Sequence, residues 1–152
     1  MNTIKISAAI ILTLAAGQAL ANPQQCTSVT QADIEQQFER WNSALLTQKS
    51  DLVAARYTDD AVLLPTLSNK VRLTKAERID YFNHFLANKP AGVIDSRTIR
   101  LGCNKAIDSG TYTFKFGDGS VAHARYTFTY SWNGKDWLIS SHHSSLMPET
   151  VG

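Results

Sequence analysis

This chain of 152 residues has little excess of positive over negative charge, no long apolar run beyond its N-terminal segment and only two cysteines. Each of these scarcities excludes a class of protein. The 15 basic and 13 acidic side chains are interspersed, without the basic block that nucleic-acid binding requires. Beyond the N-terminal segment, no stretch approaches the ~20 apolar residues of a membrane span. Nucleic acid and anionic membrane are therefore not expected partners, and no membrane span is expected.

The first 21 residues have the pattern of a secretory signal peptide. Lys5 provides the positive start, residues 6–16 form an apolar run, and Ala19-Leu20-Ala21 is a small-x-small cleavage site. A membrane anchor is the alternative, but Gln18 interrupts the run early. Cleavage after Ala21 removes Lys5 and leaves 14 basic and 13 acidic residues, a net charge of +1. We expect a periplasmic or secreted protein.

Residues 22–152 contain no internal repeat, low-complexity tract or linker, and are expected to form a single domain. Their only cysteines are Cys26 and Cys103. In an oxidising compartment a disulfide between these two is the first expectation. Lipidation of Cys26 is the alternative, although the preceding Pro23-Gln24-Gln25 lacks the small apolar residues of a lipoprotein signal. Without a CxxC pair, the sequence predicts no metal site, and it indicates no cofactor.

Two segments in the first half of the chain have apolar residues at helical spacing. Residues 31–48 are expected to form the first helix, which begins after a capping-box pattern at Thr30 and Asp33. The second helix begins after the same pattern at Thr74 and Glu77 and stops before Pro90. The spacing is carried by Ile34, Phe38, Trp41 and Leu45 in the first helix, and by Ile79, Phe82, Phe85 and Leu86 in the second. Between them we expect a short helix at 51–57 and a short strand at 61–65.

From Val93 onward the apolar period changes from 3.6 to 2, which predicts strands. Strands near 94–103, 110–116, 121–132 and 136–145 are separated by turn pairs, of which Asn133-Gly134 is the strongest hairpin signal. Helices followed by an antiparallel meander indicate an α+β fold with the helices on one face of the sheet.

The strand at 121–132 has two unlike faces. One face carries Ala122 and Ala124 with four aromatic residues, which are Tyr126, Phe128, Tyr130 and Trp132. This row suits packing on helices or on another subunit, and we expect it to form the interface of a homodimer or larger even-numbered assembly. The other face carries Arg125 among threonines, and suits either solvent or the wall of a polar cavity.

In this order of elements the chain resembles the association (hub) domain of calcium/calmodulin-dependent protein kinase II, in an exported bacterial branch, within the nuclear transport factor 2/SnoaL-like superfamily. The resemblance covers residues 30–149, and its ending is the most specific part. It rests on Phe38-x-x-Trp41-Asn42-x-Ala44-Leu45, Tyr57-x-x-Asp60-Ala61-Val62, Gly134-x-x-Trp137-Leu138 and His143-x-Ser145.

The resemblance implies a cone-shaped fold, in which a curved antiparallel sheet wraps around a long N-terminal helix and leaves a pocket at the open end. It also implies homodimers that assemble into rings, and a pocket that binds small carboxylate ligands through arginines and an aromatic residue. Arg97 and Arg125 are the arginines on strands that could play this role, and Trp41 and Tyr57 could line the cavity. The chain has no GxGxxG, HRD or DFG motif, so no kinase activity is expected.

The sequence supports catalysis less well than it supports ligand binding. Tyr57 to Pro65 resembles the segment that carries the carboxylate base of ketosteroid isomerases, but Leu64 occupies that position and cannot accept a proton. Asp60 is more typical of a turn than of a base. His143, on the same strand face as Ser145, is the best candidate for an acid, a base or an anion partner; a structural histidine is the alternative.

The sequence therefore predicts an exported, self-associating domain whose pocket binds a small polar or anionic ligand. Two alternatives remain. The first is a hydrolase, dehydratase or isomerase that uses His143, and the second is a purely structural oligomerisation module whose cone is filled by side chains.

Overall fold

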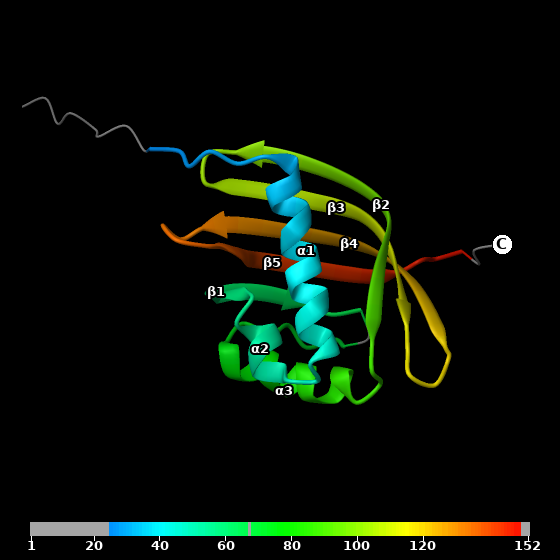
Figure 1. The fold of residues 1–152 in the computed structure, drawn as a ribbon. Coiled ribbons are helices and arrows are strands. Elements are labelled where there is room, and N and C mark those ends of the chain that lie inside the picture. Colours follow the sequence, from blue (N-terminus) through cyan, green and yellow to red (C-terminus); the bar gives the residue numbers. More distant parts are fainter. Residues whose placement is uncertain (1–24, 67, 150–152) are drawn as a thin grey trace, which may run out of the picture.

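The computed structural model describes residues 25–66 and 68–149, so the expected signal peptide lies outside the described residues. A curved sheet of five strands carries a long helix, α1 (Gln31–Leu46), across its concave face. Two shorter helices, α2 (Ser50–Ala54) and α3 (Lys75–Leu86), lie together at one end of the sheet (Figure 1). This α+β arrangement confirms the predicted fold class. None of the helices in the described part of the chain has the length and apolar character needed to cross a membrane.

Both long helices begin where the sequence predicts. At the start of α1, the Thr30 hydroxyl accepts from the backbone N–H of Asp33 (3.2 Å), and the Asp33 carboxylate accepts from the backbone N–H of Thr30 (2.8 Å). Thr74 and Glu77 form the same capping box at the start of α3. These reciprocal bonds satisfy backbone donors that a helix N-terminus leaves without partners, and so fix both helix starts.

The strands are β1 (Tyr57–Leu64), β2 (Ala91–Gly102), β3 (Lys105–Lys115), β4 (Val121–Trp132) and β5 (Trp137–Leu146), in the order β1-β5-β4-β3-β2. Four of them form the predicted antiparallel meander. The fifth corrects the expectation of a wholly antiparallel sheet, because β1 runs parallel to β5. A strand far away in sequence can join a sheet edge in either direction, and local turn signals do not specify which.

Irregular pairing bends the sheet into a half-cone. The β2–β3 register shifts between Ile94 and Ser96, and the β4–β5 register shifts between Thr129 and Tyr130. Such bulges bend and twist a strand. At Gly110 a side chain would be impossible without movement, because a Cβ there would lie 2.0 Å from the backbone oxygen of Ser96. Glycine therefore permits the close approach of β3 to the bulged part of β2.

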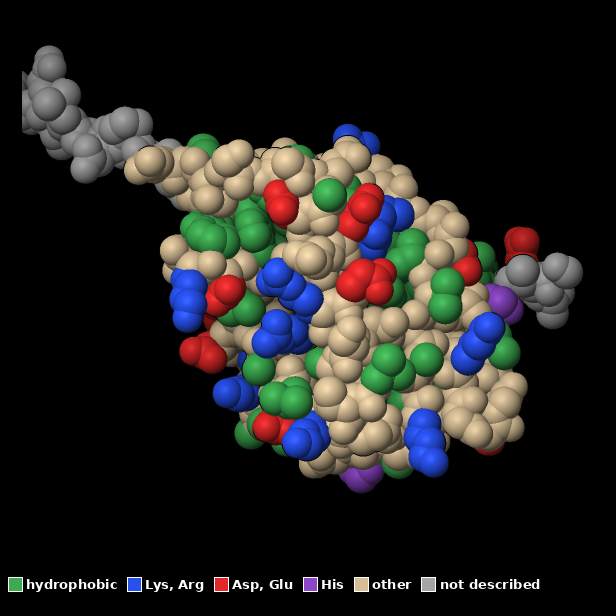
Figure 2. All heavy atoms as spheres, viewed as in Figure 1, with side chains coloured by type: hydrophobic (Ala, Val, Ile, Leu, Met, Phe, Trp, Pro, Cys, Tyr) green, Lys and Arg blue, Asp and Glu red, His purple; other side chains and the backbone are tan. Residues whose placement is uncertain are grey.

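The aromatic row of β4 lies inside the cone. Phe128 and Tyr130 are fully buried, Tyr126 is nearly so, and Trp41 of α1 packs edge-on against Phe128. This packing corrects the expectation that the row forms a subunit interface, since α1 covers it. Positive, negative and apolar side chains are interspersed over the face of the molecule that carries α1 (Figure 2).

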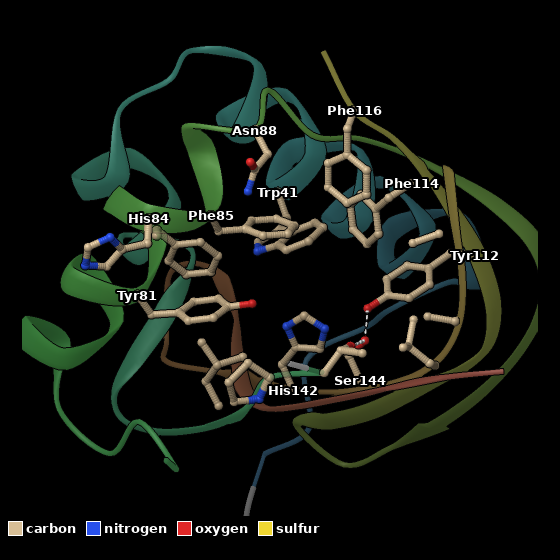
Figure 3. Close-up of a pocket in the computed structure, with 17 residues that line it drawn as sticks. Trp41, Tyr81, His84, Phe85, Asn88, Tyr112, Phe114, Phe116, His142 and Ser144 are labelled. Atoms are coloured by element: carbon tan, nitrogen blue, oxygen red, sulfur yellow. Dashed lines mark hydrogen bonds between the residues drawn. The ribbon is translucent and has the colours of Figure 1, made fainter. Parts of the chain in front are cut away.

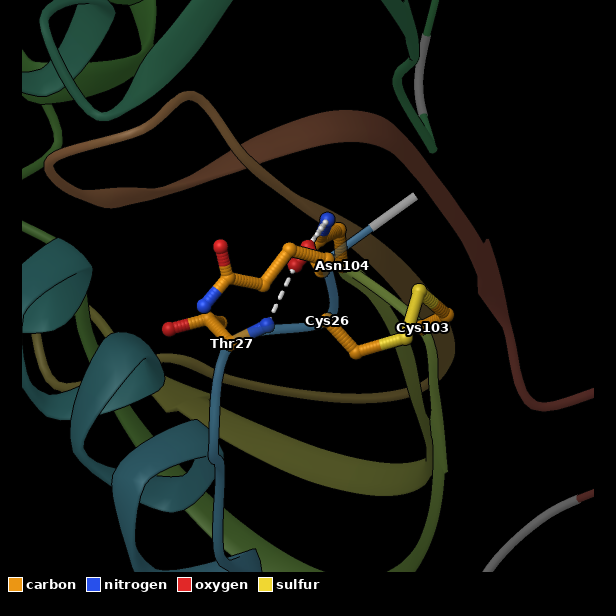
Figure 4. The surroundings of a disulfide bond; sticks show 5 residues. Cys26, Thr27, Cys103 and Asn104 are labelled. Atoms are coloured by element: carbon orange, nitrogen blue, oxygen red, sulfur yellow. Dashed lines mark hydrogen bonds between the residues drawn. A yellow bond between two sulfur atoms is a disulfide. The ribbon is translucent and has the colours of Figure 1, made fainter. Parts of the chain in front are cut away.

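The predicted disulfide joins Cys26 to Cys103, with their Cα atoms 4.9 Å apart (Figure 4). It ties the segment before α1 to the loop between β2 and β3. Asn104 reinforces the link, because its side chain accepts from the backbone N–H of Thr27 (2.8 Å) and donates to the carbonyl of Gln25 (3.0 Å).

Candidate functional site

The open end of the cone holds a cavity of about 230 Å³ between α3, the C-terminal part of β5 and the neighbouring parts of β3 and β4 (Figure 3). Its walls are mostly aromatic, from Trp41, Tyr81, Phe82, Phe85, Tyr112, Phe114 and Phe116. Its polar lining residues are Thr66, His84, Asn88, His142 and Ser144. None of the described lining residues is a lysine, an arginine or a carboxylate. The cavity is therefore mostly apolar, with a few polar groups.

His142 is the most deeply buried polar group of this cavity, with 4% of its surface exposed. Its imidazole stacks on Phe128, with ring centroids 4.0 Å apart, and projects toward the cavity (Figure 3). Its Nδ1 lies 3.0 Å from the hydroxyl oxygen of Tyr57, which lies 3.0 Å from Nε1 of Trp41. A buried chain of three side chains from α1, β1 and β5 thus ends at the cavity.

The donor and the acceptor of each of these two hydrogen bonds can be assigned, starting from Trp41. The indole N–H of Trp41 can only donate, so the Tyr57 oxygen accepts from it. The hydroxyl hydrogen of Tyr57 then has the Nδ1 of His142 as its one acceptor among the described residues. A neutral His142 consequently carries its proton on Nε2. Burial in this apolar surrounding, with a smaller contribution from His143, lowers the pKa of His142 to about 3, so the imidazole is neutral at physiological pH.

A second polar group lies beside the histidine on the same face of β5 (Figure 3). The Tyr112 hydroxyl donates to Oγ of Ser144 (2.6 Å), and Ser144 also shares a short hydrogen bond with the hydroxyl of Thr66. From α3 the Tyr81 hydroxyl points into the cavity (Figure 3). Burial raises the pKa of Tyr81 to about 12, so this phenol stays protonated and can both donate and accept.

His143, Ser145 and Arg125 lie on the convex side of the sheet, away from the cavity. This corrects their assignment to the pocket. A regular β5 would place His143 on the same face as Trp137 and Ile139, which are buried. The bulge in β5 adds one residue between Ile139 and Ser141, and a one-residue shift moves every later side chain to the opposite face. His142 and Ser144 therefore face inward.

Arg97 faces the inside of the cone but does not line the cavity. Its Nε lies 3.1 Å from Oδ2 of Asp108, and its guanidinium lies over the ring of Phe38. Asp108 is fully buried and also accepts from the Tyr126 hydroxyl (2.9 Å). The expectation that Arg97 binds a ligand carboxylate is corrected, because a protein carboxylate already pairs with it.

Of the other predicted pocket residues, Trp41 lines the cavity and Tyr57 lies directly behind His142. Arg78, which the sequence did not single out, holds this region together. It is fully buried, donates to the carbonyls of Ala61 (2.7 Å) and Thr58 (2.8 Å), and lies over the ring of Tyr57. The tyrosine that orients His142 is thus itself held in place.

Sequence reasoning missed the five polar lining residues named above, of which His142, Ser144 and Thr66 form the hydrogen bonds at the cavity. The first two were placed on the opposite face because no glycine or proline marks the bulge in β5. Thr66 follows Pro65 in the connection after β1, where strand periodicity no longer applies. Tyr112 lies on a predicted strand, but its position relative to α3 depends on the curvature of the sheet.

Comparison with solved structures places this geometry in a large group of similar folds. A Xanthomonas campestris protein described as a calcium/calmodulin-dependent protein kinase II association domain is 41% identical, with a TM-score of 0.75; the match covers 86% of this chain and all of that one. An NTF2-like protein of unknown function from Pseudomonas putida KT2440 is 18% identical, with a TM-score of 0.69 and coverages of 80% and 89%.

A third structure, from Streptomyces avermitilis and provisionally described as a dehydratase of the NTF2-like family, is 11% identical with a TM-score of 0.69. It covers 78% of this chain and 96% of its own, and shows the fold alone. No curated protein matches the chain. The model of the calcium/calmodulin dependent protein kinase II association domain matches residues 30–148, which are nearly all of the described residues. The chain therefore belongs to the calcium/calmodulin-dependent protein kinase II association domain family, within the NTF2-like fold.

Proposed function

We propose that this protein is an exported, self-associating domain that binds a small, uncharged ring compound in its cone cavity. The observation that carries the proposal is the lining of the cavity, which combines aromatic walls with a few polar groups and contains no lysine, arginine or carboxylate among the described residues. Binding pockets are usually concave, mostly apolar and equipped with a few oriented polar groups. An apolar cavity of about 150 Å³ holds benzene, so about 230 Å³ suits one substituted ring.

The same lining argues against the anionic ligand that the sequence predicted. An anion transferred into this cavity would lose its hydration without gaining a lysine or arginine partner, because no described lining residue is of either type. His142 does not supply the charge, since its burial keeps it neutral. An uncharged ligand avoids this cost.

Acid–base catalysis finds little support in the same groups. A general base needs a free lone pair and a pKa near the working pH. The Nδ1 lone pair of His142 is occupied by the Tyr57 hydroxyl, and its pKa of about 3 lies far from neutrality. Binding is therefore the better supported role, although one structural neighbour is provisionally described as a dehydratase.

Self-association is supported by the family to which the chain belongs. Because α1 covers the concave face, we place the interface on the convex face, where Val93, Ile107 and Val121 are exposed. Thr127→Arg, in the middle of this face, should shift the protein toward monomer in light scattering at micromolar concentration. Ser43→Arg, on the exposed side of α1, should not. A wild-type monomer at these concentrations would contradict this assignment.

Ligand binding can be tested with two variants on neighbouring positions of β4. Ala122 lines the cavity, whereas Val121 is exposed on the outside. Calorimetric titration with uncharged one-ring compounds should show binding to the wild type and to Val121→Phe. Ala122→Phe should lose it, because the added ring fills the cavity. Equal binding by the two variants would place the ligand elsewhere, and a preference for benzoate would contradict the uncharged class.

A further inference from the structure

We propose that the cavity selects ligands that carry a hydrogen-bond acceptor, such as a ketone or aldehyde oxygen, which receives the Nε2–H of His142. This inference rests on the proposed binding function and adds the chemical group that the ligand must present. It stands on a fixed tautomer, an unpartnered donor and a cavity of limited size.

The tautomer is fixed from behind the histidine. Trp41 can only donate to Tyr57, and Tyr57 in turn donates to Nδ1 of His142, over two distances of 3.0 Å. The opposite tautomer would place hydrogens on both Nδ1 and the Tyr57 oxygen, and would leave the buried phenol hydrogen without an acceptor among the described residues. The proton of a neutral His142 is therefore held on Nε2.

That proton has no partner in the described part of the chain. The Nε2 atom is buried and makes no hydrogen bond, while its ring lines the cavity. A buried donor without an acceptor is destabilising, and buried polar groups are almost always paired. A ligand that contacts this imidazole must therefore supply an acceptor or leave the donor unpaired.

The wall of the cavity formed by α3 also favours a ligand that carries a hydrogen-bond acceptor. The Tyr81 hydroxyl also points into the cavity, and Tyr112 donates to Ser144 rather than into the open space (Figure 3). A carbonyl oxygen has two lone pairs and can accept from His142 and from the Tyr81 hydroxyl. The aromatic walls then hold the ring of the ligand. The geometry points to an aryl ketone, aryl aldehyde or similar uncharged carbonyl compound.

Acetophenone and ethylbenzene make a matched pair of probes, because they differ in one carbonyl. The wild-type protein should bind acetophenone about tenfold more tightly, the ratio that corresponds to one hydrogen bond of about 1.4 kcal/mol. In His142→Phe the preference for acetophenone should fall severalfold, because only the Tyr81 hydroxyl remains to donate to the carbonyl; an unchanged preference would overturn the inference. Similar affinities for the two probes in the wild type would overturn the inference but leave the proposed function standing, whereas binding of neither probe would overturn both.

Two further measurements do not depend on the folding of His142→Phe. Nitrogen-15 spectra of the wild-type imidazole should show the proton of His142 on Nε2, and a proton on Nδ1 would overturn the inference. Tyr57→Phe removes the hydroxyl that fixes the tautomer without touching the cavity wall. It should populate both tautomers and reduce the preference for acetophenone severalfold, whereas an unchanged preference would show that Tyr57 does not set the selectivity.

Discussion

At the scale of single residues, His142 couples the cavity to the acid stability of the protein. Its pKa of about 3 in the folded state lies below the usual value of 6.5. Between pH 6.5 and about 3 the unfolded chain therefore binds a proton that the folded chain does not. By linkage, the free energy of unfolding falls as the pH falls through this window, by up to about 1.4 kcal/mol for each unit.

His142→Gln should remove this contribution, because glutamine can still accept from Tyr57 but does not titrate. Urea unfolding at several values between pH 6.5 and 4 should give a shallower pH dependence for the variant than for the wild type. His143→Gln replaces an exposed imidazole on the same strand and should retain most of the wild-type dependence, because His143 makes the smaller contribution to the lowered pKa of His142. If all three proteins show the same slope, His142 is not buried in its neutral form.

The charged residues show why site prediction from sequence was incomplete. Arg97 was a candidate to bind a ligand carboxylate, yet Asp108 on the neighbouring strand pairs with it. The two residues are separated by a hairpin, and only the register of that hairpin brings their side chains together. Trp41 was placed in the cavity wall from the family resemblance, and α1 does direct it there.

At the scale of elements, local signals were sufficient for the helices and hairpins. Capping residues fixed the starts of α1 and α3, and alternating apolar residues located the four strands after Val93, although β3 begins at Lys105 rather than near residue 110. The strand predicted at 61–65 is only the second half of β1, which begins at Tyr57. The bulge in β5 had no such signal, and its single extra residue reversed the assignment of His142 and His143. Pairing of β1 with β5 is a long-range contact, so its parallel direction could not be predicted from turns.

The sheet curvature gives a test at this scale. Gly110→Ala should lower the free energy of unfolding by about 1–3 kcal/mol, because the new Cβ would overlap the backbone of Ser96 and force β2 and β3 apart. Gly102→Ala is the control, since its Cβ would meet the nearest atom at an ordinary 3.5 Å. Chemical denaturation of both variants makes the comparison; equal stabilities would mean that β2 and β3 tolerate a side chain at position 110.

At the scale of the whole molecule, the disulfide closes a loop of 77 residues and so constrains the unfolded chain. The chain-entropy model gives such a loop about 4 kcal/mol of stabilisation. Cys26→Ser combined with Cys103→Ser should lower the free energy of unfolding by roughly this amount, as measured by urea titration. A reducing agent should destabilise the wild type but not the double variant, and an equal response of both would argue against the bond.

The shape of the sheet allows the two proposed roles, self-association and ligand binding, to use different faces of the molecule. Its concave face holds the core and the cavity, while its convex face remains available for a second copy. In this proposal, assembly and ligand binding use opposite sides of one sheet, and the described lining of the cavity comes from a single chain. We expect Thr127→Arg, which disturbs the convex face, to leave ligand affinity within about twofold of the wild type, because separate sites are nearly additive.

The most direct test of the account is an NMR titration of the isotope-labelled protein with acetophenone. The proposal predicts saturable shifts at Trp41, Tyr81, His142 and Ser144, with the largest change at the Nε2–H of His142. The convex-face residues Arg125 and His143 should change little. Shifts confined to the convex face, or no saturable shift at the cavity, would contradict the claim that this cavity is the binding site.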